Sequence, residues 1–298
     1  MLAGIVFALF LNTGHAAPWE QICKSARFDL EDGRSVTLAP HFLGESFVAQ
    51  RRPERGFDSA VRSAAGTTLW STPGEIRGLA SVEEDLLVLT SDRLRRFDRA
   101  GELKDEMELG THPALGNQAR AMARIGDLVV IARGRGGVAA LSLSAGRLLW
   151  EMPLAVDGGM AVGVVAVAGK FRVIATGTRE NGFNGVVTIN EAGQVLSRAP
   201  YDQRRVGVVF PEIWGQEYKG QLLINNGGWI HLITATQLDG NKAIRPRWVA
   251  HAVGEGQGQH YMMLLGDFYL KGEELWGCGS YQENRTLKSK LFRVPLPR

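Results

Sequence analysis

Four histidines are the residues of this sequence that could most readily bind a metal or exchange protons. They are His41, His112, His251 and His260, and each falls just before a predicted strand. Imidazole binds first-row metals and exchanges protons near neutral pH. If these positions share one face, His41, His112 and His260 could hold a single metal ion, which would suit a metal-assisted hydrolase, lyase or lactonase. Because the histidines come from distant parts of the chain, we expect no metal and predict no cofactor.

Other polar side chains fall at the same kind of predicted connection, where one outer strand leads to the next inner strand. Both signs of charge occur there, which suits a polar ligand or a peptide. The predicted ligand-binding residues are therefore His41, His112, Asp157, Arg204, Arg205, His251 and His260, with Tyr201 and Asp202 on the same face. Catalytic residues stay unassigned, because the sequence contains no nucleophile elbow, HExxH, phosphate loop or EF-hand spacing.

Glycine turns divide the chain into the elements that must position these residues. The stretch Gly126–Trp150 predicts strands over 128–132 and 138–143 and a third beginning at Leu148, with a hairpin turn at Gly134–Gly137. Comparable turns recur at spacings of about 33 to 47 residues, and propeller repeats run at about 40–50. They lie at Gly33, Gly66, Gly101, Gly146, Gly193 and Gly240.

Six hairpins, each preceded by a strand of small apolar residues, indicate the architecture. The preceding strands are expected near residues 41–43, 76–82, 119–125, 160–168, 206–214 and 261–270. We predict an all-β chain that forms a single β-propeller of six four-stranded blades, with seven blades as the alternative. Residues 22–38 would supply the outer strand that closes the last blade. Trp70, Trp150 and Trp248 are expected to dock between neighbouring blades.

The first sixteen residues predict export. Leu2–Leu11 is apolar but far shorter than the ~20 residues that span a bilayer, and Gly14, His15 and Ala16 precede a plausible cleavage point. We predict a secretory signal over 1–16 and a propeller domain over 17–298, located in the periplasm or outside the cell, with no membrane span. A buried N-terminal strand or helix is the alternative, and the basic residues that usually open a signal are missing.

The two cysteines of the exported chain are candidates for a disulfide. Cys23 and Cys278 lie near opposite ends of the sequence, and an exported chain meets oxidising conditions. We predict that they pair and so fasten the closing blade. Two free buried thiols are the alternative.

The charge balance argues against nucleic acid as a partner. The chain has 34 basic and 31 acidic residues, for a net charge of +3, whereas nucleic-acid binding needs basic charge clustered on one face. The densest basic run is Arg93, Arg95 and Arg96. We interpret it as a solvated strand.

The unit GDLVVIARGRGGVAALSLSAGRLLW resembles the repeat of the pyrroloquinoline-quinone-type propellers. The matching positions are Gly137, Ala140, Leu141, Gly146, Leu149 and Trp150, and Ala65, Gly66, Leu69 and Trp70 match the last part of the repeat. The resemblance implies a propeller that is either a quinoprotein dehydrogenase or a scaffold of the outer-membrane assembly lipoprotein type. The dehydrogenases are longer and carry adjacent cysteines, and the lipoprotein carries a lipobox; this chain has neither feature.

These observations favour an exported, non-catalytic propeller that binds a protein, a peptide or a polar ligand at the channel-mouth face. A protein or peptide is the expected partner. The metal-assisted enzyme described above is the alternative, and a quinone-dependent oxidoreductase is a third hypothesis.

Overall fold

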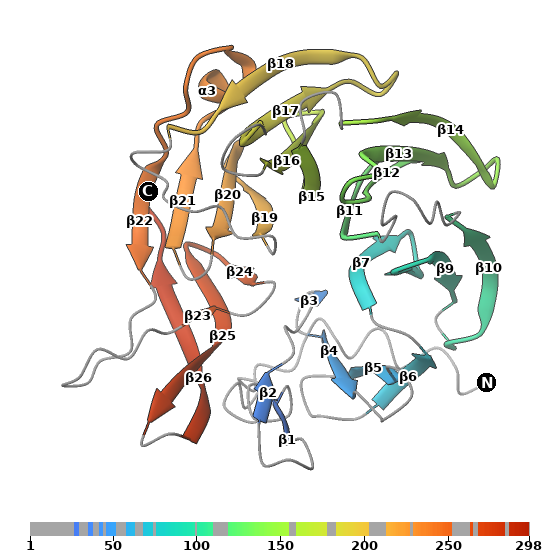
Figure 1. The fold of residues 1–298 in the computed structure, drawn as a ribbon. Helices are drawn as coiled ribbons and strands as arrows, with labels where there is room; N and C mark the ends of the chain where they lie inside the picture. Colours follow the sequence, from blue (N-terminus) through green and yellow to red (C-terminus); the bar gives the residue numbers. More distant parts are fainter. Residues whose placement is uncertain are drawn as a thin grey trace. The chain divides into compact units, whose positions relative to one another are not determined.

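Short strands joined by tight turns dominate the computed structural model (Figure 1). The structure describes residues 27–29, 35–37, 42–43, 46–51, 58–62, 68–73, 76–98, 100–109, 119–154, 159–177, 183–202, 213–226, 229–251, 263–264, 268–283 and 286–297. Contacts divide the chain into two units. Unit 1 comprises Met1–Thr90, Leu94–Glu106 and Ala252–Arg298, and unit 2 comprises Ser91–Arg93 and Met107–His251.

Three four-stranded antiparallel sheets form unit 2, and in each the strands pair in chain order. The first consists of β11 (Ala121–Ile125), β12 (Leu128–Ala132), β13 (Val138–Ser142) and β14 (Arg147–Met152). The second consists of β15 (Gly159–Val167), β16 (Lys170–Gly177), β17 (Gly185–Ile189) and β18 (Val195–Pro200). The third consists of β19 (Ile213–Tyr218), β20 (Gln221–Asn226), β21 (Trp229–Ile233) and β22 (Arg247–His251).

The first strands of these sheets lie next to one another, because β11 contacts β15 and β15 contacts β19. The strands predicted within Gly126–Trp150 are confirmed as β12, β13 and β14, and the predicted turn at Gly134–Gly137 carries backbone hydrogen bonds from Gly136 to Arg133 and from Gly137 to Gly134. Alternation of side chains along each strand then directs one set of residues to each neighbouring sheet.

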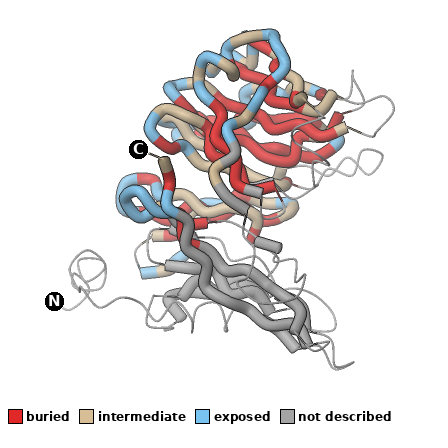
Figure 2. Tube along the Cα trace, turned by 90° about the vertical axis from the view of Figure 1, so that its left-hand side faces the viewer, coloured by how far each residue is buried: buried red, intermediate tan, exposed pale blue. Residues whose placement is uncertain are grey.

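Two buried layers hold the three sheets together, and they differ in polarity. Between the first and second sheets the packed side chains are apolar, with Val130, Val164 and Phe171 among them. Between the second and third sheets the layer contains Ile174 and Ile224 but also polar residues, discussed below. Figure 2 shows the buried residues running along the strands and the exposed ones gathering at the turns.

A β-bulge recurs in the fourth strand of four sheets. At each bulge, two adjacent residues of the third strand pair with two residues of the fourth strand that have one unpaired residue between them. The extra residues are all apolar and are Leu69, Leu149, Leu196 and Val249. A bulge bends the outer strand and turns side chains away from the sheet. The bulge is therefore a recurring feature of these four sheets.

Two glycines fix how the third strand begins. A Cβ added at Gly137 would overlap the carbonyl oxygen of Met152, and one added at Gly185 would overlap that of Ala199. In both cases the Cα of a proline, Pro153 or Pro200, is also within 3 Å of the added atom. No side chain fits where the fourth strand passes this closely. The two sheets thus share glycine, proline and bulge at equivalent places.

Unit 1 holds most of the remaining strands. One sheet contains β3 (Phe42–Leu43), β4 (Ser46–Arg51), β5 (Asp58–Arg62) and β6 (Thr68–Pro73), and another contains β7 (Ile76–Val82), β8 (Asp85–Thr90), β9 (Arg93–Phe97) and β10 (Leu103–Glu108). Arg93 and residues 107–108 belong to unit 2. Ile76, Leu86, Val88 and Phe97 form a buried cluster in the second of these sheets.

The C-terminal sheet of unit 1 has an interrupted first strand. Both β23 (Met263–Leu264) and β24 (Tyr269–Lys271) pair with β25 (Glu274–Glu283), which in turn pairs with β26 (Thr286–Pro295). The predicted strand at 261–270 is thus present in two short pieces. Near the N-terminus, β1 (Arg27–Asp29) pairs with β2 (Ser35–Thr37), and β2 also contacts β26. No ladder between β2 and β26 occurs among the described residues, so closure of the last blade stays a prediction.

One expectation about unit 2 is tested only in part and another is wrong. The strand predicted at 206–214 overlaps β19 at Ile213 and Trp214, and residues 203–212 lie outside the described part. The predicted turn at Asp239–Gly240 is instead the end of a short helix, α3 (Ala235–Asp239). The physical reason is a capping box: Thr234 accepts a hydrogen bond from the Gln237 backbone, and the Gln237 side chain returns to the Thr234 backbone.

Candidate functional site

The predicted ligand-binding residues fall almost entirely outside the described residues. This holds for His41, His112, Asp157, Arg204, Arg205 and His260, and also for Cys23. His251 is the last residue of β22, opposite Trp229, and Cys278 lies in β25 opposite Leu291. Because only His251 and Cys278 lie in the described part of the chain, both the channel-mouth site and the Cys23–Cys278 pairing stay predictions.

Tyr201 lies in the core, although the sequence placed it on the ligand-binding face. Its side chain is 4% exposed, and its hydroxyl has no hydrogen-bond partner among the described residues. His231 lies within β21, in the middle of a strand as predicted, with both ring nitrogens buried and likewise without a partner. Burial lowers the pKa of His231 to about 4, so the ring is neutral at pH 7. Among the described residues no group of three metal-ligating side chains occurs.

The basic run on β9 is neutralised by acidic residues of neighbouring strands. Arg95 Nε lies 2.5 Å from Glu106 Oε2, and Arg96 Nε lies 2.6 Å from Asp85 Oδ2. Lys104 Nζ also approaches Asp85, at 3.0 Å. Burial raises the pKa of the Asp85 carboxyl, but Lys104 and Arg96 outweigh that effect and hold it below its usual value. This strand offers no uncompensated basic face of the kind that nucleic acid requires.

A tryptophan ties the first sheet of unit 2 to the second. Trp150 follows the bulge of β14, and its indole Nε1 donates to the carbonyl oxygen of Glu191, in the turn between β17 and β18, at 3.0 Å. The indole also lies against Gly193 of that turn, where an added Cβ would come 2.8 Å from the ring. The prediction that Trp150 docks on a neighbouring sheet is confirmed.

The contact between the second and third sheets repeats this side-chain-to-carbonyl hydrogen bond with a different side chain. Ser197 follows the bulge of β18 as Trp150 follows that of β14. Its hydroxyl donates to the carbonyl oxygen of Leu238 at 2.5 Å, and both ties join residues 41 apart in sequence. Leu238 therefore holds the place of Glu191. Here the connection between the third and fourth strands contains α3, whose Leu238 side chain is fully buried.

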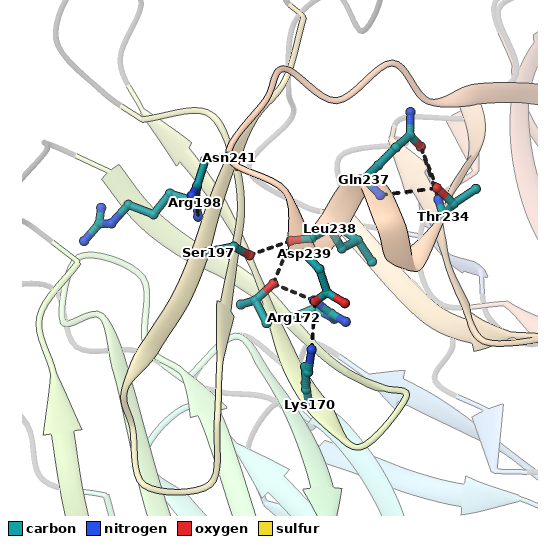
Figure 3. Close-up of polar contacts among 10 residues, drawn as sticks. Lys170, Arg172, Ser197, Arg198, Thr234, Gln237, Leu238, Asp239 and Asn241 are labelled. Atoms are coloured by element: carbon teal, nitrogen blue, oxygen red, sulfur yellow. Dashed lines mark hydrogen bonds and ion pairs between the residues drawn. The ribbon is translucent and has the colours of Figure 1, made fainter.

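Polar contacts fasten α3 to the second sheet (Figure 3). Arg172 is fully buried, and its Nη1 donates to Thr188 Oγ1 at 2.6 Å and to Asp239 Oδ1 at 2.7 Å. Lys170 Nζ donates to the same carboxylate oxygen at 3.1 Å. Burial raises the pKa of Asp239, but Arg172 and Lys170 together hold it below its usual value. The carboxylate is thus charged and compensates a buried guanidinium.

The loop after α3 covers the outer edge of β18. The Arg198 N–H donates to Asn241 Oδ1 at 3.0 Å (Figure 3), and the Ile244 N–H donates to the Pro200 carbonyl at 2.6 Å. Asp202 in turn donates its N–H to Ile244, and Tyr201 and Ile244 form a parallel bridge. An edge strand with free backbone groups can pair with another segment. In the second sheet, the loop after α3 of the same chain already pairs with part of the edge of β18.

Beside β14 no described residue pairs with the strand edge in this way, and the surface next to that strand is the candidate site. A depression of about 430 Å³ is lined by Ile125, Gly126, Asp127, Leu128, Ser142, Ala145, Arg147, Leu149 and Glu191; we call it the rim depression. Leu148 is 47% and Leu149 45% exposed. Beyond the strand ladder, β14 makes no backbone–backbone hydrogen bond to any described residue.

The polar side chains of the rim depression differ in whether they already have hydrogen-bonding partners. Asp127 accepts hydrogen bonds from Ser142 Oγ at 2.6 Å and from the Ser144 N–H at 2.7 Å, and these bonds lower the pKa of its carboxyl. Arg147 is exposed and has no ionic or hydrogen-bonding partner among the described residues. The depression therefore combines an exposed leucine, Leu149, with one cation, Arg147, and two carboxylates, Asp127 and Glu191.

Sequence reasoning missed both Arg172–Asp239 and the rim depression. A signal for the first was present: Arg172 interrupts the apolar run of a predicted strand, and a buried arginine requires an anionic partner. A signal for the second was the pair of adjacent leucines after Gly146, because alternation allows only one of two neighbours to face the core.

The model of one protein family, described as outer membrane protein assembly factor BamB, matches residues 3–204 of the chain. No curated protein sequence matches it. Among solved structures, the chain resembles BamB from Moraxella catarrhalis with 11% identity and a TM-score of 0.47, covering 86% of this chain and 70% of that one.

Two further solved structures superpose with higher TM-scores. The WD40 repeats of RRP9 give 12% identity and a TM-score of 0.56 over 87% of this chain and 79% of that one. U3-55K gives 11% identity and a TM-score of 0.55 over 92% and 90%. At such identities the likeness concerns the fold alone, and it agrees with the repeated four-stranded sheets: the chain has β-propeller architecture.

Proposed function

The chain belongs to the family of the outer membrane protein assembly factor BamB, and on this premise we propose that it is an exported, non-catalytic β-propeller that binds a partner protein. The name of the family describes assembly of other proteins, which supports a binding role. Rigid repeated sheets with variable connections also suit recognition.

Exposed apolar pairs at the start of consecutive outer strands carry the proposal. Leu148 and Leu149, the second and third residues of β14, are 47% and 45% exposed, and Val195 and Leu196, the first two of β18, are 40% and 47% exposed. Isolated exposed apolar residues are ordinary, but adjacent pairs at the same place in two sheets, next to a depression, are typical of interaction surfaces.

The finer features belong to the same proposal. We propose six blades closed by an N-terminal strand, a single propeller domain over 17–298, and a signal over 1–16 removed on export to the periplasm. The Cys23–Cys278 disulfide would staple the closing blade. No helix in the described part of the chain has the length and apolarity that crossing a bilayer requires. Mass spectrometry of the exported chain should find Ala17 or Pro18 at its N-terminus, and alkylation before reduction should label neither cysteine.

A direct test uses a paired substitution on the rim. We expect the variant Leu148→Glu/Leu149→Glu, affinity-purified after expression in its own cells, to lose partner proteins that the parent retains. Exposed substitutions of this kind change stability by about 0.5 kcal/mol or less, so the melting temperature should hold. Leu103→Glu, which charges a leucine with 53% exposure on β10, is the matched control and should retain the partners. Equal retention by both variants would contradict the proposed surface.

Metal analysis tests the enzymatic alternative. Its residues, His41, His112 and His260, lie outside the described part of the chain. We expect the purified protein to contain no stoichiometric metal and His112→Ala to melt like the parent. One tightly bound equivalent that disappears in His112→Ala would favour the metal-assisted enzyme instead.

A further inference from the structure

We propose that the loop after α3 binds an acidic segment of a partner protein. Residues 241–247 comprise this loop and the first residue of β22, and we call them the basic loop. They include Lys242, Arg245 and Arg247 and contain no acidic residue. The inference rests on the proposed function and specifies the chemistry of the segment that the partner contributes.

The backbone of the basic loop is held in place by contacts with α3 and with the end of β18. Ile244 is fully buried, its N–H donates to the Pro200 carbonyl at 2.6 Å, and its carbonyl accepts from the Asp202 N–H at 3.1 Å. The carbonyl of Arg245 accepts from Gln237 Nε2 at 2.8 Å. Because the backbone is already ordered, binding through the side chains of this loop costs less conformational entropy than binding through a mobile one.

The side-chain charges of the basic loop are largely uncompensated. Lys242 and Arg247 are exposed, and neither has an ionic or hydrogen-bonding partner among the described residues. Arg245 is 69% exposed, and its Nε lies 4.0 Å from Asp202 Oδ2, a distance at which solvent screens most of the attraction. All three cations are therefore accessible to an external anion.

The carboxylates near the basic loop do not cancel its charge. Asp239, at the end of α3, already accepts from two cations of the second sheet, Lys170 and Arg172 (Figure 3). Among the described residues, Asp202 is then the one carboxylate within ion-pair distance of the loop. Three cations thus face one carboxylate. Like charges held together repel one another, and an external carboxylate relieves that repulsion.

The basic run on β9 shows the opposite arrangement. Arg95 and Arg96 have carboxylates of neighbouring strands at 2.5 and 2.6 Å, those of Glu106 and Asp85. Those cations contribute to the contacts between strands of their own sheet. The basic loop has no comparable set of acidic neighbours, so its charge is directed to the solvent and to whatever binds there.

An exposed apolar pair lies close to the basic loop. Val195 and Leu196 are 40% and 47% exposed. The next residue of β18, Ser197, donates to the Leu238 carbonyl at 2.5 Å, in the helix that leads into the loop. One partner segment can therefore reach both features, and it needs apolar side chains for the pair as well as carboxylates for the loop.

The composition of the basic loop favours a peptide over a membrane surface. Two of its three cations are arginines, whose planar guanidinium binds a carboxylate through two parallel hydrogen bonds. Recognition of an anionic lipid surface typically uses clusters of about 4–8 Lys and Arg residues. Three cations on an ordered backbone are better suited to individual carboxylates of a protein segment.

Site-specific photo-crosslinking tests the inference. The probe is p-benzoylphenylalanine, placed at position 243 of the full chain in its own cells. Ala243 is exposed and lies between Lys242 and Arg245, so the probe leaves all three cations in place. Ala100, exposed in the equivalent connection between β9 and β10, is the control position. We expect position 243, and not position 100, to give an adduct with a partner protein whose crosslinked peptide contains several acidic residues and at least one apolar residue.

Removal of one charge tests the ionic part of the inference. An exposed ion pair changes a binding constant by up to about fivefold, so Arg247→Gln should lower the yield of the adduct from position 243 by about that factor. Arg135→Gln is the matched control: it removes an exposed cation, also without a partner among the described residues, from the turn between β12 and β13. The control should leave the yield unchanged.

Several outcomes would overturn the inference. They are an adduct from position 243 to a lipid, to a second copy of this chain or to a peptide without acidic residues, the same partner peptide from position 100, and a yield that Arg247→Gln leaves unchanged or that both variants lower equally. If position 243 gives no adduct while affinity purification of the parent retains partner proteins, the inference fails and the proposed function stands. If the parent retains no partner protein either, both fail.

Discussion

Asp239→Asn is the substitution that most directly tests how α3 is held. The change keeps the shape of the side chain and an oxygen acceptor but removes the charge that compensates Arg172. Arg172 has no exposed surface, and its Nε and Nη2 have no partner among the described residues. Asp239 is the carboxylate that reaches its guanidinium, at 2.7 Å. The variant therefore leaves a buried positive charge without an anion.

The expected cost follows from the burial of the two partners. Breaking a fully buried ion pair costs about 3–5 kcal/mol. Asp239 is 41% exposed, so solvent screens part of the interaction, and exposed pairs contribute only about 0.2–1 kcal/mol. Arg172 is as buried as a residue of a fully buried pair, whereas the burial of Asp239 lies between that of a buried and that of an exposed pair. We expect Asp239→Asn to lower the free energy of unfolding by about 2–3 kcal/mol.

Urea denaturation followed by far-ultraviolet circular dichroism measures this loss, and a double-mutant cycle isolates the pair. In an Arg172→Met background the buried charge is gone, so Asp239→Asn should cost less than about 1 kcal/mol. Lys170→Met is the control for the second cation: Lys170 is 36% exposed, and its loss should cost under about 1 kcal/mol. A loss below about 0.5 kcal/mol for Asp239→Asn, equal in both backgrounds, would refute an ionic attachment of α3.

Three further predictions concern single positions. Burial lowers the pKa of His231 to about 4, so between pH 6.5 and 4 the unfolded chain binds a proton at this residue and the folded chain does not. Between pH 7 and pH 4 the free energy of unfolding should therefore fall by about 3 kcal/mol more in the parent than in His231→Gln, as measured by denaturation at both pH values. Gly185→Ala should destabilise by at least about 2 kcal/mol because of its overlap with a backbone carbonyl, whereas Gly169→Ala, at φ +69° with open space around it, should cost only about 1 kcal/mol. Trp150→Phe should cost about 1 kcal/mol through loss of the indole hydrogen bond, and an unchanged thermal melt would argue against that tie.

The sequence was sufficient where local chemistry decides the structure. The strand at 128–132 and the turn at Gly134–Gly137 were predicted at their observed positions, because β-branched runs and glycines that tolerate a positive φ act over a few residues. The docking of Trp150 was predictable for a related reason: a large, partly apolar ring at the end of a repeat needs a neighbour to cover it.

Features that depend on distant residues were not predictable. The helix α3 is a single turn of five residues, too short to give a helical period, and it is stabilised by contacts with Thr188, Ser197 and Arg172 from another sheet. The rim depression is a difference between two junctions, and it is apparent only when the register of both sheets is known. Neither feature has a local signature that could locate it in a sequence.

The contacts between neighbouring sheets of unit 2 follow one pattern with two different side chains, Trp150 and Ser197. Beside β14, the indole of Trp150 covers Gly193, and no described residue makes a further backbone hydrogen bond to the edge of that strand. Beside β18, the smaller Ser197 contacts α3, and the loop after this helix binds the edge of β18. The repeated framework of glycine, proline and bulge is the same in both sheets, so the difference lies in the connection between the third and fourth strands of the next sheet, which is a short turn at Glu191–Gly193 and contains α3 in the other case.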